Sequence, residues 1–287
     1  MLHGSCFTSK VVLMSHRDYA KSRSKLSMFG GADADELAPF RTTSLMWMSG
    51  ISLLIVPMLT LIDVPVGRWL AIHRPSKEVA SLFELAGYFS HATGVFLILL
   101  CILLMAPRRR RYVPRLAVLA MGAGAVSTLA KMFVLRERPS RINLDIATYD
   151  KAWHWVFDWS LDQVATFDAG TRAFPSSNMA VAAAFAIGLA AVLPRGRWVF
   201  AMMLLGTMLH RMYSGAHFIS DVFGGAAFGL IWGYVCFHPK LLGSLFDRME
   251  SERRPKRPLF EEKIPRIDEA TRVDDAKSDE DKGRFAA

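Results

Sequence analysis

Cysteine is scarce in this chain of 287 residues, which contains three cysteines far apart in the sequence. Cys6, Cys101 and Cys236 form neither a pair nor a short motif, so the sequence predicts no disulfide framework and no zinc site. The chain also lacks an internal repeat of fixed period, which excludes a solenoid array.

Charged residues are missing from four long apolar stretches. No Asp, Glu, Lys or Arg occurs between Arg41 and Asp63, Glu84 and Arg108, Arg172 and Arg195, or Asp221 and Lys240. Each stretch is close to the roughly 20 residues that a helix needs to cross a bilayer. Two further apolar runs, 116–135 and 198–218, contain one cation each, Lys131 and Arg211. Six such stretches would leave a soluble protein without a hydrated surface, so we expect an all-α polytopic membrane protein, a six-transmembrane helical bundle.

The ends of the chain are far more charged than its middle. We therefore predict a cytoplasmic N-terminal segment at 1–41, a membrane domain at 42–239, and a charged, largely disordered cytoplasmic tail at 240–287. The basic run 108–111 lies between two predicted spans, so we interpret it as a topology signal and not as a contact for anionic lipid or nucleic acid. If the dense basic clusters lie on the cytoplasmic side, six spans place both termini in the cytoplasm.

Two predicted outer connections have distinctive compositions. The first, 63–83, mixes apolar and basic residues and suits a helix that lies in the membrane interface. The second, 136–173, is the longest connection and contains Trp153, Trp155, Phe157 and Trp159. We interpret this aromatic cluster as part of the belt at headgroup depth, with an entrance for acyl chains as the alternative.

The two cations inside apolar runs are the first functional signal, because an ionisable group at membrane depth is costly unless it is paired or hydrated. Arg138 follows Lys131 by seven residues, which places both on one helical face, and Pro139 then ends or redirects the helix. Lys131 alone would be compatible with snorkelling to the interface. The pair predicts two cations at the same end of a span.

The run with Arg211 is followed by a histidine and an aspartate. His217 and Asp221 are four residues apart, so on a helix the carboxylate can accept a hydrogen bond from the imidazole. This bond would leave the second ring nitrogen free as a base or nucleophile. The alternative, a simple cap of the following span, does not account for Arg211 six residues upstream.

The fourth span begins after Phe174 and Pro175 with Ser176, Ser177 and Asn178. Such residues are ordinary at a helix start, but the start of a helix also presents free backbone N–H groups to an anion. In a six-span chain this start lies on the same membrane face as Lys131, Arg138, Arg211 and His217. Three cations, a helix N-terminus and a His–Asp pair fit phosphate best.

These three motifs, in this order, resemble the signature of the type 2 phosphatidic acid phosphatase (PAP2) superfamily of membrane lipid phosphatases. The resemblance extends over roughly residues 40–239. It implies that Lys131, Arg138 and Arg211 bind phosphoryl oxygens and that Ser176 and Ser177 complete the cradle. It also implies that His217 forms a phosphohistidine oriented by Asp221. No metal or other cofactor is implied, and the active site of bacterial members faces the periplasm across the cell inner membrane.

Two positions depart from the family pattern. Asn178 occupies the place of the histidine that protonates the leaving group, and His210 replaces a serine before Arg211. An amide cannot deliver a proton, and loss of a general acid is expected to cost about 10²–10⁴ in rate. Three explanations of Asn178 are open. It can be a substitution made to trap an inactive enzyme, or the natural residue of a protein that binds phosphate without turnover. Alternatively, His210 can supply the proton instead.

We therefore expect a hydrolase that releases phosphate from a lipid phosphate or diphosphate. The alternatives are a catalytically impaired homologue that binds phospholipid headgroups, and a lipid phosphotransferase. Phosphatidylglycerol phosphate, lipid A, a polyprenyl diphosphate and phosphatidic acid are all compatible substrates. The lack of an acid at position 178 favours diphosphates, because phosphate is a better leaving group than an alkoxide. The sequence makes no prediction about oligomeric state.

Overall fold

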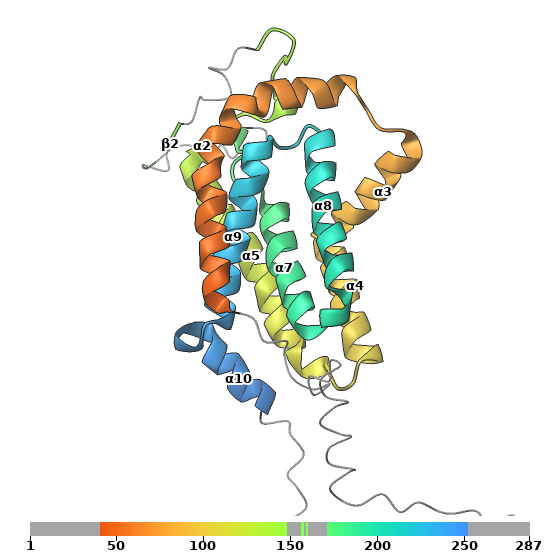
Figure 1. Cartoon of the computed structure of the whole chain (residues 1–287), viewed down its shortest axis with the longest axis vertical. Coiled ribbons are helices and arrows are strands. Elements are labelled where there is room, and N and C mark those ends of the chain that lie inside the picture. The colour runs from red at the N-terminus through yellow and green to blue at the C-terminus, as the bar shows by residue number, and fades with distance from the viewer. Residues whose placement is uncertain (1–40, 148–155, 158, 160–170, 252–287) are drawn as a thin grey trace, which may run out of the picture. The chain divides into compact units, whose positions relative to one another are not determined.

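A computed structural model describes residues 41–147, 156–157, 159 and 171–251. Within these residues the fold is built from α-helices, shown in chain order in Figure 1. Their bounds are α2 Thr42–Ile72, α3 Lys77–Tyr88, α4 Ala92–Met105, α5 Val113–Phe133, α7 Ser177–Val192, α8 Arg197–Tyr213, α9 Ile219–Phe237 and α10 Ser244–Ser251. Two short strands, β1 Val134–Leu135 and β2 Val156–Phe157, pair antiparallel after α5.

The helices confirm an all-α membrane protein, but the six-span count stays a prediction. Helix α2, helix α9 and the segment Arg110–Phe133, which includes α5, are long and apolar enough to cross a bilayer. Helices α3 and α4 would form a fourth span as one bent pair, with 67° between them. Helix α7 is apolar but only 16 residues long.

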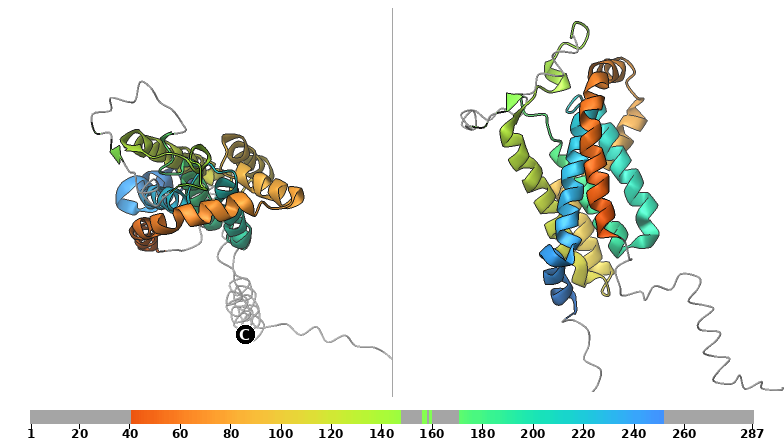
Figure 2. Two further views of the ribbon diagram at one scale, coloured as in Figure 1. Left: turned by 90° about the horizontal axis from the view of Figure 1, so that it is seen from above. Right: turned by 60° about the vertical axis from the view of Figure 1, so that its left-hand side comes forward.

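Helix α2 is longer than a single span requires. Its 31 residues correspond to about 46 Å at 1.5 Å per residue, against a hydrocarbon core of about 30 Å. The second half turns and runs across the ends of neighbouring helices (Figures 1 and 2). Pro57 and Pro65 lie inside the helix, and proline is the usual cause of such a bend. The expected interfacial helix at 63–83 is thus divided between the end of α2 and the start of α3.

Helices α7 and α9 form the centre of the bundle, with α5, α8 and α2 packed against them. Eleven of the sixteen residues of α7 are buried, and six of these are alanines. Gly225 and Gly229 of α9 lie directly against backbone carbonyls at the start of α7. A Cβ at either glycine would overlap the carbonyl of Ser176 or Ala180. Small residues at such positions allow two helices to pack closely inside a membrane. This contact fixes the start of α7 against the start of α9.

The predicted disordered tail begins with ordered structure. A helical turn at Pro239–Gly243 leads into α10, which packs against the start of α5. The guanidinium of Arg115 is buried between the rings of Phe237 and Phe246 and forms ion pairs with Asp247 and Glu250. The prediction of disorder is therefore wrong for residues 244–251, where charged side chains bind α10 to α5. Residues 252–287 and the N-terminal segment 1–40 lie outside the described residues.

Candidate active site

The end of α5 and the segment before α7 are tied together by two basic residues. The Arg172 guanidinium donates to the carbonyls of Lys131 and Met132, at 2.8 Å and 2.6 Å, and thereby caps the C-terminal end of α5. In return, the Lys131 ammonium donates to the Arg172 carbonyl at 3.3 Å. Both side chains are buried. The sequence analysis assigned no role to Arg172, because the composition of a loop does not show whether an arginine caps a helix or lies on the surface.

The cations predicted to bind phosphate are brought to one place. The charges of Arg138 and Arg211 act on Lys131, and that of Arg138 acts on Arg211. The Nε atom of Arg138 is buried and has no hydrogen-bond partner among the described residues. Three cations with few opposing carboxylates form a positive site for an anion with more than one charge.

Helix α7 begins at this positive site. Ser176 is its N-cap residue, yet its hydroxyl makes no capping bond, and this buried Oγ has no hydrogen-bond partner among the described residues. Its backbone N–H donates to the Asp221 carbonyl at 3.1 Å, which joins the starts of α7 and α9. Ser177 contacts the hydroxyl of Ser127 on α5 at 3.3 Å. The unpartnered hydroxyl and the helix N-terminus leave donors available for an anion.

Asn178 lies against Arg211. With the amide oxygen turned toward the guanidinium, this oxygen is 2.8 Å from Nε and 3.0 Å from Nη1 of Arg211. An amide in this position accepts from Arg211 and carries no transferable proton. The structure thus brings the predicted acid position into the cation cluster and gives its side chain a partner.

His217 lies in the connection between α8 and α9, with 5% of its surface exposed. Its Nδ1 atom is 3.9 Å from Oδ2 of Asp221, which is longer than a hydrogen bond. The same Oδ2 atom accepts from the backbone N–H of Phe218 at 2.9 Å. The carboxylate therefore faces Nδ1, but the hydrogen bond expected from a helical i,i+4 pair is not formed, because His217 precedes α9 and does not lie on it.

Burial lowers the pKa of the His217 imidazole below its usual value. The nearby charges of Lys131 and Arg138 act in the same direction, whereas Asp221 opposes them. An imidazole in this setting is neutral at pH 7, which is the form that a nucleophile needs.

Part of the chain is similar to known proteins. Residues 112–240 match the model of the PAP2 superfamily. This part of the chain is similar to the PAP2 superfamily. A solved structure, described as the first transmembrane PAP2 type phosphatidylglycerolphosphate phosphatase from Bacillus subtilis, is also similar. It has 15% sequence identity and a TM-score of 0.48, over 76% of this chain and 100% of that chain. No curated protein matches the sequence.

The family prediction is therefore confirmed, and the PAP2 region includes all three motifs, from Lys131 to Asp221. Helices α2, α3 and α4 lie before this region, although the resemblance was expected to begin near residue 40. The roles of the individual site residues stay predictions.

His210 of the PAP2 region is directed toward α3. Its ring packs so closely on Gly87 that a Cβ there would overlap Nδ1, and the charge of Glu84 acts on it. Its Nδ1 atom is buried without a hydrogen-bond partner among the described residues. The histidine that could replace the missing acid thus contacts α3, whereas Asn178 contacts Arg211.

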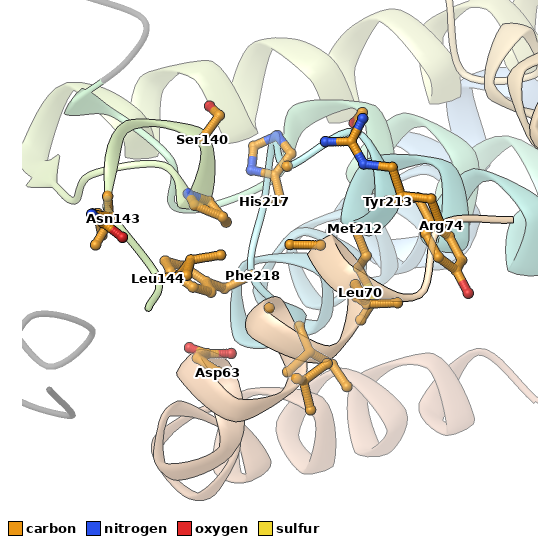
Figure 3. A pocket seen from close by; sticks show the side chains of 18 of the residues that line it. Asp63, Leu70, Arg74, Ser140, Asn143, Leu144, Met212, Tyr213, His217 and Phe218 are labelled. Carbon is orange, nitrogen blue, oxygen red and sulfur yellow. The ribbon is translucent and has the colours of Figure 1, made fainter. Parts of the chain in front are cut away.

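A cavity of about 380 Å³ lies beside His217, the predicted nucleophile. Its wall is formed by the second half of α2, the segment 139–145 and the segment 212–219. His217, Asp63, Arg74, Ser140 and Tyr213 are among its lining residues, as Figure 3 shows. Apolar residues from the same segments, including Leu70 and Met212, complete the lining. The cavity can take a group with polar and apolar parts next to His217.

Proposed function

We propose that this chain is a membrane phosphatase that hydrolyses a lipid phosphate or diphosphate through a phosphohistidine. The convergence of Lys131, Arg138 and Arg211 on a buried, neutral His217 carries the proposal. A protein that merely binds phosphate gains nothing from a neutral histidine backed by a carboxylate, because a further cation would bind the anion more strongly.

The first step transfers the phosphoryl group to the enzyme. The three cations and the N–H groups at the start of α7 would hold the nonbridging oxygens, with the Ser176 hydroxyl as a further donor. Nε2 of His217 attacks phosphorus as the bond to the leaving oxygen breaks. Asp221 then stabilises the positive charge that develops on the ring.

The second step releases phosphate. Water attacks the phosphohistidine, the P–N bond breaks, and His217 is regenerated with inorganic phosphate as product. In the first step the leaving oxygen takes its proton from water, because the Asn178 amide has none to give. With a lipid diphosphate, the bond between the terminal phosphorus and the bridging oxygen breaks, and the leaving group is the lipid monophosphate, which is stable without this proton. We therefore propose that diphosphate lipids turn over faster than monophosphate lipids.

The distribution of basic residues between the two ends of the helices supports a proposed orientation in the membrane. The site is assigned to the outer face, the periplasmic side of a bacterial inner membrane, because the denser basic clusters lie at the opposite ends of the helices. The cavity beside His217 is assigned to the group that remains attached to the leaving oxygen, with Arg74 at its edge.

Phosphate release by purified protein in detergent, without added metal, tests the proposal. Diacylglycerol diphosphate and a polyprenyl diphosphate should release phosphate faster than phosphatidic acid or phosphatidylglycerol phosphate. His217→Ala should abolish release from all four lipids. Equal or faster turnover of the monophosphates contradicts the proposed preference, and no release from any lipid contradicts the proposed activity.

Asn178→His separates an enzyme from a binding protein. A histidine at this position could protonate the leaving oxygen, so turnover of monophosphate lipids should rise by about 10²-fold or more, with a smaller gain for diphosphates. The matched variant Asn178→Gln keeps an amide and should show no gain.

The second candidate function, a headgroup-binding protein, is favoured by the contact of Asn178 with Arg211. It predicts stoichiometric binding of lipid phosphate to the unsubstituted chain without turnover. Phosphate transfer to an added alcohol, measured in the same assay, would indicate the phosphotransferase instead.

A further inference from the structure

Asp221 is bound more strongly to an arginine than to the histidine it faces. The Arg136 guanidinium donates from Nη1 to Oδ1 of Asp221 and, at 2.7 Å, to the hydroxyl of Ser220. Arg136 and Asp221 are both buried. If no second carboxylate were near Arg136, its positive charge would neutralise the Asp221 carboxylate. His217 would then lack a negative partner for the positive charge that it acquires on phosphorylation.

The opposing charge comes from the first described helix. Nη2 of Arg136 donates to Oδ2 of Asp63 on α2, and Asp63 has only 1% of its surface exposed. The two oxygens of Asp63 also accept from the backbone N–H and the hydroxyl of Ser220, the former at 3.1 Å. Two carboxylates, Asp63 and Asp221, therefore share the single positive charge of Arg136. One negative charge remains in this group of three side chains and can stabilise a positive charge on His217.

The backbone of Arg136 is itself fixed by hydrogen bonds to the segment before α7. Its N–H donates to the Thr171 carbonyl and its carbonyl accepts from Ala173, both at 2.8 Å, in a parallel bridge. Its guanidinium also lies 4.9 Å from the centre of the Phe218 ring. Arg136 is thus fixed between α2 and α9, and the position of its charge depends on both carboxylates.

We propose that Asp63 is a positioning residue, which neutralises Arg136 so that the Asp221 carboxylate remains available to His217. The inference rests on the proposed function. It extends the catalytic machinery to α2, a helix outside the region that matches the family. Asp63 borders the cavity beside His217, but its carboxylate is buried and bound to Arg136 and Ser220, so it acts on His217 through Arg136.

Asp63→Asn tests the inference by removing the opposing charge while keeping the shape of the side chain. We expect kcat for phosphate release to fall at least tenfold with KM changed less than twofold, because the cations that bind phosphate are untouched. The control is Ser52→Ala, which removes a hydrogen bond from the same helix to the Phe223 carbonyl of α9, at 2.8 Å. It should keep kcat within twofold. A value of kcat within twofold in Asp63→Asn overturns the inference.

A double-mutant cycle shows whether Asp63 acts through Arg136. In an Arg136→Met background, the further change Asp63→Asn should have less than a twofold effect, since the charge to be neutralised is gone. A full tenfold loss in that background overturns the inference. If Asp63→Asn does not yield folded protein, Ser220→Ala takes its place. It weakens the same bridge, and we expect a threefold to tenfold loss of kcat. An unchanged kcat in this variant overturns the inference equally.

Binding of orthovanadate, which mimics the five-coordinate phosphorus, gives a readout that needs no turnover. Wild-type protein that binds vanadate without releasing phosphate refutes the proposed function alone. In that case a tenfold or greater loss of vanadate affinity in Asp63→Asn, but not in Ser52→Ala, still supports the inference. Unchanged affinity overturns it, and a wild-type protein that neither binds vanadate nor turns over overturns both.

Discussion

His217 shows how one side chain can be prepared for chemistry by its surroundings. Its burial favours the neutral ring, and the nearby cations that would bind substrate favour it further. The i,i+4 spacing predicted that Asp221 lies near this residue, but not that His217 precedes α9 instead of lying on it. Spacing could not reveal that Asp221 is held by Arg136, since these two residues are 85 positions apart in the sequence.

The pH dependence of kcat/KM should report this environment. Protonation of His217 removes the nucleophile, and its pKa is lowered, so the acid limb should lie below pH 6.5. The limb is measured between pH 4.5 and 8. Asp221→Asn removes the opposing carboxylate and should move the limb further toward acid. If Asp221→Asn does not move the acid side of the pH profile, this side reports ionisation of the substrate, and its assignment to His217 is wrong.

Helices, unlike individual contacts, were largely predictable from the absence of charge. The stretches that lack Asp, Glu, Lys and Arg correspond in order to helices α2, α4, α7 and α9. Their ends were less predictable. Helix α2 continues through Asp63 because that carboxylate is paired inside the fold, and α10 forms in a charged segment because Arg115 is buried against it. A charge marks the end of an apolar helix only when it has no buried partner.

Docking of α10 should weaken as the pH rises. Burial raises the pKa of Glu250 to about 7, with Arg115 opposing this shift, so the folded protein binds this proton more tightly than the unfolded chain. The stabilisation is complete below about pH 4.5 and is lost as the pH rises through about 7. The loss should not exceed about 1.4 kcal/mol per pH unit, the value for one proton.

Thermal unfolding in detergent between pH 4.5 and 7.5 measures this effect. Glu250→Gln should flatten the dependence over that range. Asp247→Asn, which removes a more exposed partner of the same arginine, should leave the slope in place. An identical slope in the wild-type and Glu250→Gln proteins would show that Glu250 does not control docking.

For the whole molecule, the decisive property is that distant helix ends meet on one membrane face. Cysteine accessibility in intact cells tests which face this is. In a background with Cys6, Cys101 and Cys236 replaced by serine, Ser214→Cys beside the site should react with an impermeant maleimide added from outside. Pro107→Cys, at the opposite helix ends, should react only after the cells are broken. The reverse pattern would assign the site to the cytoplasm.

The pairing of Asp63 with Arg136 has a consequence for protein engineering. A fragment cut to the family boundary at residue 112 would retain each signature residue and still lose the carboxylate that balances a buried arginine. Removing one partner of a buried ion pair typically costs about 3–5 kcal/mol. Minimal versions or chimaeras should therefore carry α2 from the same parent as α9, because the two helices share one electrostatic unit.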